Sequence, residues 1–203
     1  MNNYLSSLKL DLDISNMKEA ISSFPNQIEN AFELISNNNL NKAYFNINSI
    51  IVIGMGGSAI GGDVARVICQ DDCKLPIFIN RSYSIPKWVN EKTLVIASSY
   101  SGNTEETLSA FNLCMQKKCS IIVLSTGGKL LDYASKFNLD NIKLPSSLQP
   151  RAALGYSFTL ILLLLNKLGY VNDNIINLVH QSIPNLIDLS ENMTKEKNNA
   201  LNI

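Results

Sequence analysis

The sequence predicts an α/β fold: a doubly wound, five-stranded parallel sheet in the order 2-1-3-4-5, with helices on both faces and a helical arm at the N-terminus. Three observations lead to this prediction. Short apolar runs alternate along the chain with segments of helical periodicity. The runs are apolar at consecutive positions, as expected of strands that are covered on both faces. Single helices separate them, which is typical of right-handed βαβ crossovers.

The helical arm precedes the sheet. Apolar side chains recur at helical spacing through 15–36, and Pro25 interrupts the pattern once. The segment SNNNLN at 36–41 then ends the pattern. The predicted divisions of the chain are 1–44 for the arm, 45–190 for the sheet domain, and 191–203 for the start of a linker and a further domain.

The sheet domain contains the alternating elements. Its most apolar stretch, 158–170, has an uninterrupted core far shorter than the roughly 20 residues that cross a bilayer, so we expect a buried helix there. The predicted strands are 49–54, 75–80, 93–99, 120–126 and 141–145. The predicted helices are 58–70, 103–118, 129–137, 151–168 and 172–189.

The composition argues against several classes of partner. Lys plus Arg and Asp plus Glu both number 17, so no net charge attracts the chain to nucleic acid or to an anionic membrane. The N-terminus has no basic region followed by an apolar run, so we expect a cytoplasmic protein without a secretory signal. The four cysteines form two loose pairs without C-x-x-C spacing, which predicts free thiols and no metal site.

A glycine-rich turn follows the first predicted strand. The segment GMGGSA at 54–59 matches the relaxed dinucleotide pattern G-x-G-x-x-A. Glycines also let backbone N–H groups approach any phosphate at a helix N-terminus. A dinucleotide site usually has an acidic residue at the end of the second strand, where this chain has instead Arg81, which could meet a 2′-phosphate. A tight turn without a ligand is the third interpretation.

A second loop, SSYSGNTEET at 98–107, follows the third predicted strand. Asn103 and Glu106 could form a capping pair that starts the next helix. A helix cap needs only one side chain of this kind, however, and the loop has further hydroxyl groups. The surplus donors suggest an anion with several oxygens. The hydroxyl groups are those of Ser99, Ser101 and Thr104.

The first and third strands are neighbours in the predicted order, so both loops lie at the carboxyl edge of the sheet, at its switch point. Ser58 of the first loop could then converge with the hydroxyl groups of the second. Hydrogen bonds to a charged acceptor contribute roughly 1.5–3 kcal/mol each, so these groups could hold one phosphate monoester without a lysine. The residues favour this interpretation over a dinucleotide.

The motifs resemble those of a known family. GMGGSAIGGD at 54–63 and SSYSGNTEET at 98–107 are similar to the phosphosugar-binding loops of the sugar isomerase (SIS) domain family. LPSSLQPRAALGYSF at 144–158 resembles the Q-P-R-x-x-x-G element in the first half of the bifunctional phosphoglucose/phosphomannose isomerases. The resemblance covers about 45–190, with three motifs in the same order, and implies a flavodoxin-like SIS domain.

The resemblance implies a hexose 6-phosphate substrate. Arg151 would stabilise the cis-enediolate intermediate of aldose–ketose isomerisation, which interconverts glucose or mannose 6-phosphate and fructose 6-phosphate. Its place after Pro150 agrees with this role, because a cation in the first turn of a helix opposes the helix dipole and needs an anionic partner. A structural salt bridge is the alternative. The residues that would bind the phosphate are Gly56, Gly57, Ser58, Ser99, Ser101 and Thr104.

The resemblance also implies groups that this chain does not match. In the family the base is a glutamate and the ring-opening group is a histidine of a neighbouring subunit of a homodimer, both in a second SIS half, with no cofactor. Glu105 and Glu106 are expected to be helix-start residues, and His180 lies in a predicted helix. We therefore expect this chain to be the phosphate-binding first half, inactive alone. The alternatives are a stand-alone SIS module that senses a phosphosugar and an NADP-dependent oxidoreductase.

Overall fold

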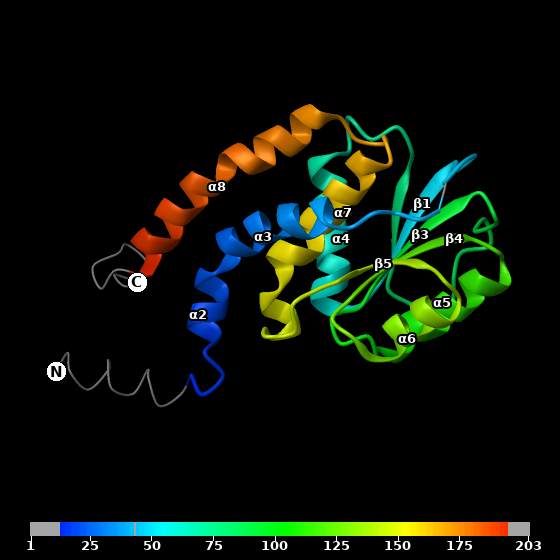
Figure 1. The fold of residues 1–203 in the computed structure, drawn as a ribbon, viewed down its shortest axis with the longest axis horizontal. Helices are drawn as coiled ribbons and strands as arrows, with labels where there is room; N and C mark the ends of the chain where they lie inside the picture. The colour runs from blue at the N-terminus through cyan, green and yellow to red at the C-terminus, as the bar shows by residue number, and fades with distance from the viewer. Residues whose placement is uncertain (1–12, 43, 195–203) are drawn as a thin grey trace.

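A computed structural model describes residues 13–42 and 44–194, and its centre is a five-stranded sheet in the order β2-β1-β3-β4-β5 (Figure 1). Every pair of neighbouring strands is parallel, which confirms the predicted order and direction. The strands are β1 Ser49–Ile53, β2 Ile77–Asn80, β3 Thr93–Ser98, β4 Ser120–Ser125 and β5 Asp140–Lys143.

Helices cover both faces of the sheet. In Figure 1, α5 and α6 lie on one side of the strands, and α4, α7 and α3 lie on the other. The helices of the described part are α2 Met17–Ser22, α3 Phe24–Ser36, α4 Gly56–Ile68, α5 Glu105–Gln116, α6 Gly128–Lys136, α7 Leu154–Lys167 and α8 Asp173–Thr194, with a 3₁₀ turn, η1, at Pro150–Ala152.

The central strands divide the core into two layers. Successive side chains of a strand point to opposite faces. In β1, Ile50 and Val52 belong to the cluster that packs against α7, whereas Ile51 and Ile53 belong to the cluster beneath α5 and α6. All four are fully buried. Apolar residues at consecutive positions were therefore a correct sign of strands covered on both faces.

The most apolar helix is a core helix, as predicted. Every residue of α7 from Gly155 to Leu165 is buried, because α3 and α4 pack against it. None of the helices in residues 13–42 and 44–194 is both long enough and apolar enough to span a bilayer.

Two helical predictions differ from the structure. The segment 15–36 forms two helices, α2 and α3, because the chain turns at Ser23 and Pro25 then occupies the first turn of α3, where its missing N–H has no consequence. The last helix, α8, runs to Thr194 rather than ending near 189, and it continues through Pro184. The proposed divisions at 1–44 and 191–203 lie partly outside the described residues.

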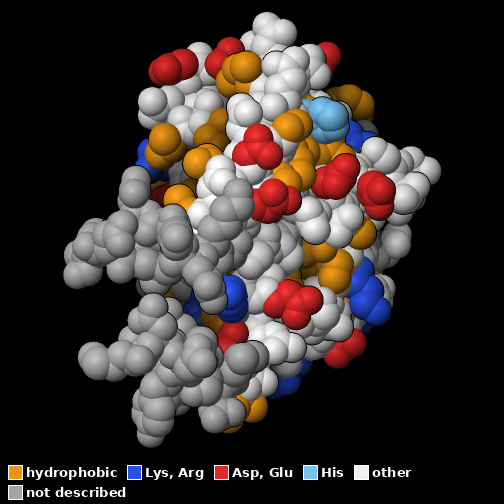
Figure 2. Space-filling view, turned by 90° about the vertical axis from the view of Figure 1, so that its left-hand side faces the viewer, with side chains coloured by type: hydrophobic (Ala, Val, Ile, Leu, Met, Phe, Trp, Pro, Cys, Tyr) orange, Lys and Arg blue, Asp and Glu red, His pale blue; other side chains and the backbone are white. Residues whose placement is uncertain are grey.

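Helix α8 extends away from the sheet past α3 (Figure 1). His180 is exposed on α8, and its ring meets Phe32 of α3 edge-on, with 5.2 Å between centroids. The face that carries His180 shows apolar side chains interspersed with carboxylates (Figure 2). The exposed apolar residues of α8 are Leu178, Ile187, Leu189 and Met193.

A buried carboxylate joins the arm to the sheet. Asp140, at the start of β5, accepts hydrogen bonds from the Tyr44 hydroxyl at 2.6 Å and from the backbone N–H groups of Asn41 and Lys42 at 2.8 and 3.0 Å. Burial alone would raise the pKa of the Asp140 carboxyl. The hydrogen bonds from Tyr44 and the two amides outweigh burial and hold that pKa below its ordinary value.

This arrangement predicts an acid-sensitive stability. A depressed pKa in the folded state means that the contribution of Asp140 is present above the ordinary pKa of about 3.9 and is lost as the pH falls through the folded value. We expect Asp140→Asn to lower the free energy of unfolding by about 2–3 kcal/mol at pH 7, with the difference from wild type shrinking below about pH 4. Urea denaturation at pH 7 and below pH 4 measures the free energies of unfolding of wild type and variant. The control is Asp132→Asn, which removes an exposed carboxylate of α6. Equal stability of Asp140→Asn and wild type at pH 7 would contradict this role.

Candidate functional site

The two glycine- and hydroxyl-bearing loops meet at the carboxyl ends of adjacent strands. Ile53, the last residue of β1, pairs with Ala97 of β3, so the loop after each strand starts at the same edge of the sheet. The Oγ of Ser58 accepts a hydrogen bond from the backbone N–H of Tyr100 at 3.2 Å. The two loops therefore meet at this edge, as the sequence predicted, and a direct hydrogen bond joins them.

The second loop is held by its own hydroxyl groups. The Oγ of Ser99 lies 3.0 Å from the Oγ1 of Thr104, and it also accepts from the N–H of Gly102 at 3.2 Å. The Oγ of Ser101 accepts from the N–H of Asn103 at 3.2 Å. These bonds hold residues 99–104 in a turn and fix the positions of its hydroxyl groups.

Several of these hydroxyl groups have a proton that donates no hydrogen bond. Within the part of the chain that the structure describes, Ser58 and Ser101 accept hydrogen bonds but donate none through their hydroxyls. The Ser99–Thr104 pair shares one bond, so one of its two protons is also free. Ser58 and Ser99 are buried, whereas Ser101 is exposed and Thr104 is half-buried. The loops thus present up to three hydroxyl donors, from the interior to the surface.

Two helix N-termini add backbone donors. Helix α4 starts at Gly56 and helix α5 at Glu105, and neither has a side-chain cap. The N–H groups of Gly56 and Gly57 donate to no described residue. Helix N-termini carry a partial positive charge and unpaired N–H groups, which together favour an anion. The site can therefore hold an anion without a cationic side chain.

The predicted capping pair at the start of α5 is wrong. Thr104 is the N-cap residue, and Asn103 does not bond to Glu106. The Asn103 side chain instead donates to the carbonyl of Ser101 at 3.3 Å and accepts from the N–H of Lys129 at 3.1 Å. It therefore ties the loop to α6, while Glu105 and Glu106 occupy the first turn of α5 as predicted.

Arg151 does not lie where the sequence predicted. It sits in η1, a 3₁₀ turn that ends before α7 begins at Leu154, so the argument from the dipole of a helix at 151–168 is wrong. The Arg151 side chain is exposed and makes no hydrogen bond or ion pair with any described residue. The alternative of a structural salt bridge is therefore not realised within residues 13–42 and 44–194.

The backbone of η1 lies against the first loop. A Cβ built on Gly57 would lie 2.8 Å from the carbonyl oxygen of Pro150 and 3.4 Å from the Cα of Arg151. Such a close approach requires glycine at this position. The structure thus brings the third motif next to the first.

Tyr100 connects all three motifs, and the sequence argument overlooked it. Its hydroxyl donates to the carbonyl of Pro145 at 2.7 Å and accepts from the N–H of Leu148 at 3.0 Å. Burial raises the pKa of Tyr100, so the hydroxyl stays protonated and remains a donor. The backbone N–H of Tyr100 also donates to Ser58, so Tyr100 joins both loops to the segment that leads to Arg151. The available sequence signal was its position, since it is the one aromatic residue among the serines of the second loop.

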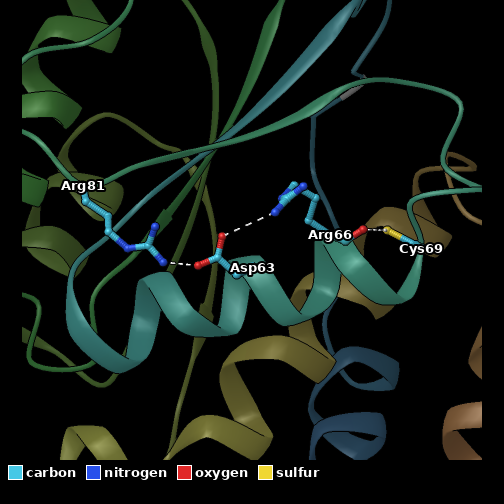
Figure 3. Close-up of polar contacts among 4 residues, drawn as sticks. All are labelled: Asp63, Arg66, Cys69 and Arg81. Atoms are coloured by element: carbon cyan, nitrogen blue, oxygen red, sulfur yellow. Dashed lines mark hydrogen bonds and ion pairs between the residues drawn. The ribbon is translucent and has the colours of Figure 1, made fainter.

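Arg81, the candidate for a 2′-phosphate, already has an acidic partner. Its guanidinium is paired with Asp63 of α4, which also lies 3.9 Å from Arg66 (Figure 3). A nucleotide phosphate at this position would have to displace the Asp63 carboxylate. The geometry therefore weighs against the dinucleotide interpretation.

Several known proteins are similar to this chain in sequence. No family model matches the chain. A bifunctional phosphoglucose/phosphomannose isomerase of Caldicellulosiruptor bescii is 46% identical over 180 residues, which cover 89% of this chain and 53% of that protein. A D-glucosamine-6-phosphate 4-epimerase of Sulfolobus acidocaldarius is 35% identical over 150 residues, 73% of this chain and 47% of that protein. The chain spans about half the length of these curated relatives.

A solved structure shares the fold. The C-terminal domain of glucosamine-fructose-6-phosphate aminotransferase from Francisella tularensis superimposes with a TM-score of 0.62 at 15% identity, over 87% of this chain and 54% of that one. At this identity the similarity establishes the architecture alone.

The turn at Gly102 gives a direct test of the loop geometry. Gly102 has φ +71°, and a Cβ there would lie 1.8 Å from the carbonyl oxygen of Gly127. We expect Gly102→Ala to lower the free energy of unfolding by about 3 kcal/mol or more, from backbone strain and overpacking together. Gly127→Ala is the control, because its backbone is extended (φ 170°) and a Cβ there would meet nothing within 4 Å. Chemical denaturation of both variants measures their stabilities, and equal stabilities would show that the loops after β3 and β4 do not pack as described.

Proposed function

Because the chain belongs to the sugar isomerase (SIS) domain family, with homologues among the bifunctional phosphoglucose/phosphomannose isomerases, we propose that it binds the phosphate group of a hexose 6-phosphate between the loops after β1 and β3. The enzyme reaction that this binding serves is aldose–ketose isomerisation, in which glucose or mannose 6-phosphate and fructose 6-phosphate interconvert through a cis-enediolate.

The observation that carries this proposal is the bond from Tyr100 to Ser58, which joins two loops with free donors at one edge of the sheet. Phosphate oxygens accept several hydrogen bonds at once, and each bond to a charged acceptor contributes roughly 1.5–3 kcal/mol. The bond from Tyr100 to Ser58 brings the two groups of donors together. The proposed donors are the amides of Gly56 and Gly57, the hydroxyls of Ser58 and Ser101, and one hydroxyl of the Ser99–Thr104 pair.

Arg151 is the proposed catalytic cation. As a base takes the proton from C2 of the open-chain aldose, negative charge develops on the C1 oxygen, and a nearby guanidinium lowers the energy of that state. The exposed guanidinium of Arg151 has no partner among the described residues, and its backbone adjoins Gly57. A sugar phosphate anchored at the loops would extend its chain toward this group.

Proton transfer between C1 and C2 also needs a general base. We assign no base within the described residues: Glu105 accepts from the Tyr83 hydroxyl at 3.5 Å and belongs to the start of α5. The proposal places the base and the ring-opening acid in a second SIS half of a homodimeric, cytoplasmic enzyme. Residues 45–190 then supply the phosphate site and Arg151.

The relative named as a 4-epimerase supports a separation between the groups that bind phosphate and the groups that determine the reaction. Its name assigns it a hexosamine 6-phosphate and a different bond change, yet it matches 73% of this chain. A phosphate site common to both reactions would explain this, since the phosphate is on C6 in both substrates and neither reaction changes a bond at C6. On this proposal, the choice between isomerisation and epimerisation depends on groups beyond the two loops.

Removing the outer hydroxyl groups tests the binding site. We expect the double variant Ser101→Ala, Thr104→Val to bind fructose 6-phosphate at least about tenfold more weakly, since each lost bond to the phosphate is worth roughly 1.5–3 kcal/mol. Ser109→Ala is the matched control on α5, where the hydroxyl donates to the Tyr83 carbonyl away from the loops. Titration calorimetry with fructose 6-phosphate, and with fructose as the ligand control, measures the change. Unchanged affinity for fructose 6-phosphate would refute the phosphate site.

Turnover by the 203-residue chain tests the placement of the base. We expect fructose 6-phosphate incubated with this chain to form glucose 6-phosphate no faster than without protein, because the proton has no carrier. A coupled assay for glucose 6-phosphate detects the product. Turnover at an enzymatic rate would place the base within these residues and contradict this part of the proposal.

A further inference from the structure

A buried glutamine of the N-terminal arm touches the segment that carries Arg151. Gln27, in α3, is only 2% exposed. Its Nε2 donates to the carbonyl of Ala152 at 2.8 Å, and its Oε1 accepts from the N–H of Gly155 at 3.1 Å. One side chain therefore bonds to both sides of the junction between η1 and α7.

These bonds account for the local backbone. The helix does not start at Pro150, although residues 151–154 include no glycine or proline that would prevent it. The Ala152 carbonyl, which an unbroken helix would use internally, bonds to Gln27 instead. The close packing leaves no room for a larger residue, since a Cβ on Gly155 would lie 2.7 Å from the Gln27 Cβ. The arm thus fixes where η1 ends and α7 begins.

Packing alone does not explain a glutamine here. Its neighbours on the inner face of α3, Ile28 and Ala31, are buried and apolar, as helix–helix contact requires. A buried amide is costly unless it is hydrogen-bonded. An apolar residue would make the contact between α3 and α7 without that cost, but it would leave the Ala152 carbonyl and the Gly155 N–H unpaired. The Nε2 of Gln27 also donates to the Ala20 carbonyl at 3.2 Å and to the Ser23 Oγ at 3.3 Å, so the side chain joins the corner between α2 and α3 to η1.

We infer that Gln27 is a positioning residue for Arg151, so that the helical arm forms part of the active site. Tyr100 holds the chain at Pro145 and Leu148, before Arg151, and Gln27 holds it at Ala152 and Gly155, after Arg151. The guanidinium stays free while its backbone is fixed on both sides. This inference rests on the proposed function, in which Arg151 meets the enediolate.

A double-mutant cycle on the 203-residue chain tests it. The probes are arabinonate 5-phosphate, a sugar acid whose carboxylate stands in for the enediolate, and inorganic phosphate, which needs only the loops. We expect Gln27→Met and Arg151→Gln each to weaken arabinonate 5-phosphate about tenfold, and the double variant to bind no more weakly than either single one, because Gln27 acts through Arg151. Inorganic phosphate should bind equally to all four proteins. Ile28→Val, a buried change in the same helix, is the matched control and should leave both affinities within about twofold.

The outcomes separate the inference from the proposed function. If wild type binds both probes and the two losses add, or if Gln27→Met weakens both probes equally, Gln27 is structural only and the inference is wrong. If wild type binds neither probe, the proposed function fails first and the inference fails with it. Retained phosphate binding by Gln27→Met shows that this variant is folded.

Discussion

The pairing of β1 with β3 is the constraint on which the site depends. These strands are not consecutive in the sequence, yet their hydrogen-bonded register ends both at one edge of the sheet. The N-termini of α4 and α5 and the loop hydroxyl groups therefore lie at the same edge of the sheet, and the bond from Tyr100 to Ser58 joins the two loops. Without that pairing, Ser58 and Thr104 would be unrelated turn residues. A fold with this strand order makes an anion site from backbone geometry before any cationic side chain is considered.

Features that depend on burial were predictable from the sequence. The central strands β1, β3 and β4 are apolar at consecutive positions because both faces are covered, and their predicted bounds differ from the observed ones by at most a residue. The edge strand β2 starts at Ile77 rather than 75, since Pro76 has no N–H to donate to the ladder. The two loops were found by their composition, and their meeting followed from the order of the strands.

The surroundings of Arg151 were not predictable, because they depend on contacts between distant residues. Gln27 and Ala152 are 125 positions apart, and nothing in the local pattern at 150–155 shows that the helix is interrupted there. The same holds for Asn103, whose side chain serves α6 rather than the helix that it precedes. In both cases a local rule of helix initiation gave way to a tertiary hydrogen bond. The arm, which the sequence presented as an appendage, packs against the core helix α7 and supplies one of these bonds.

The most direct measurement is a crystal structure of the chain with fructose 6-phosphate. The account predicts phosphate density within hydrogen-bonding distance of the Gly57 amide and the hydroxyls of Ser58 and Thr104, with the sugar carbons on the side of Arg151. Phosphate density at the Asp63–Arg81 pair, or a sugar bound away from both loops, would contradict it.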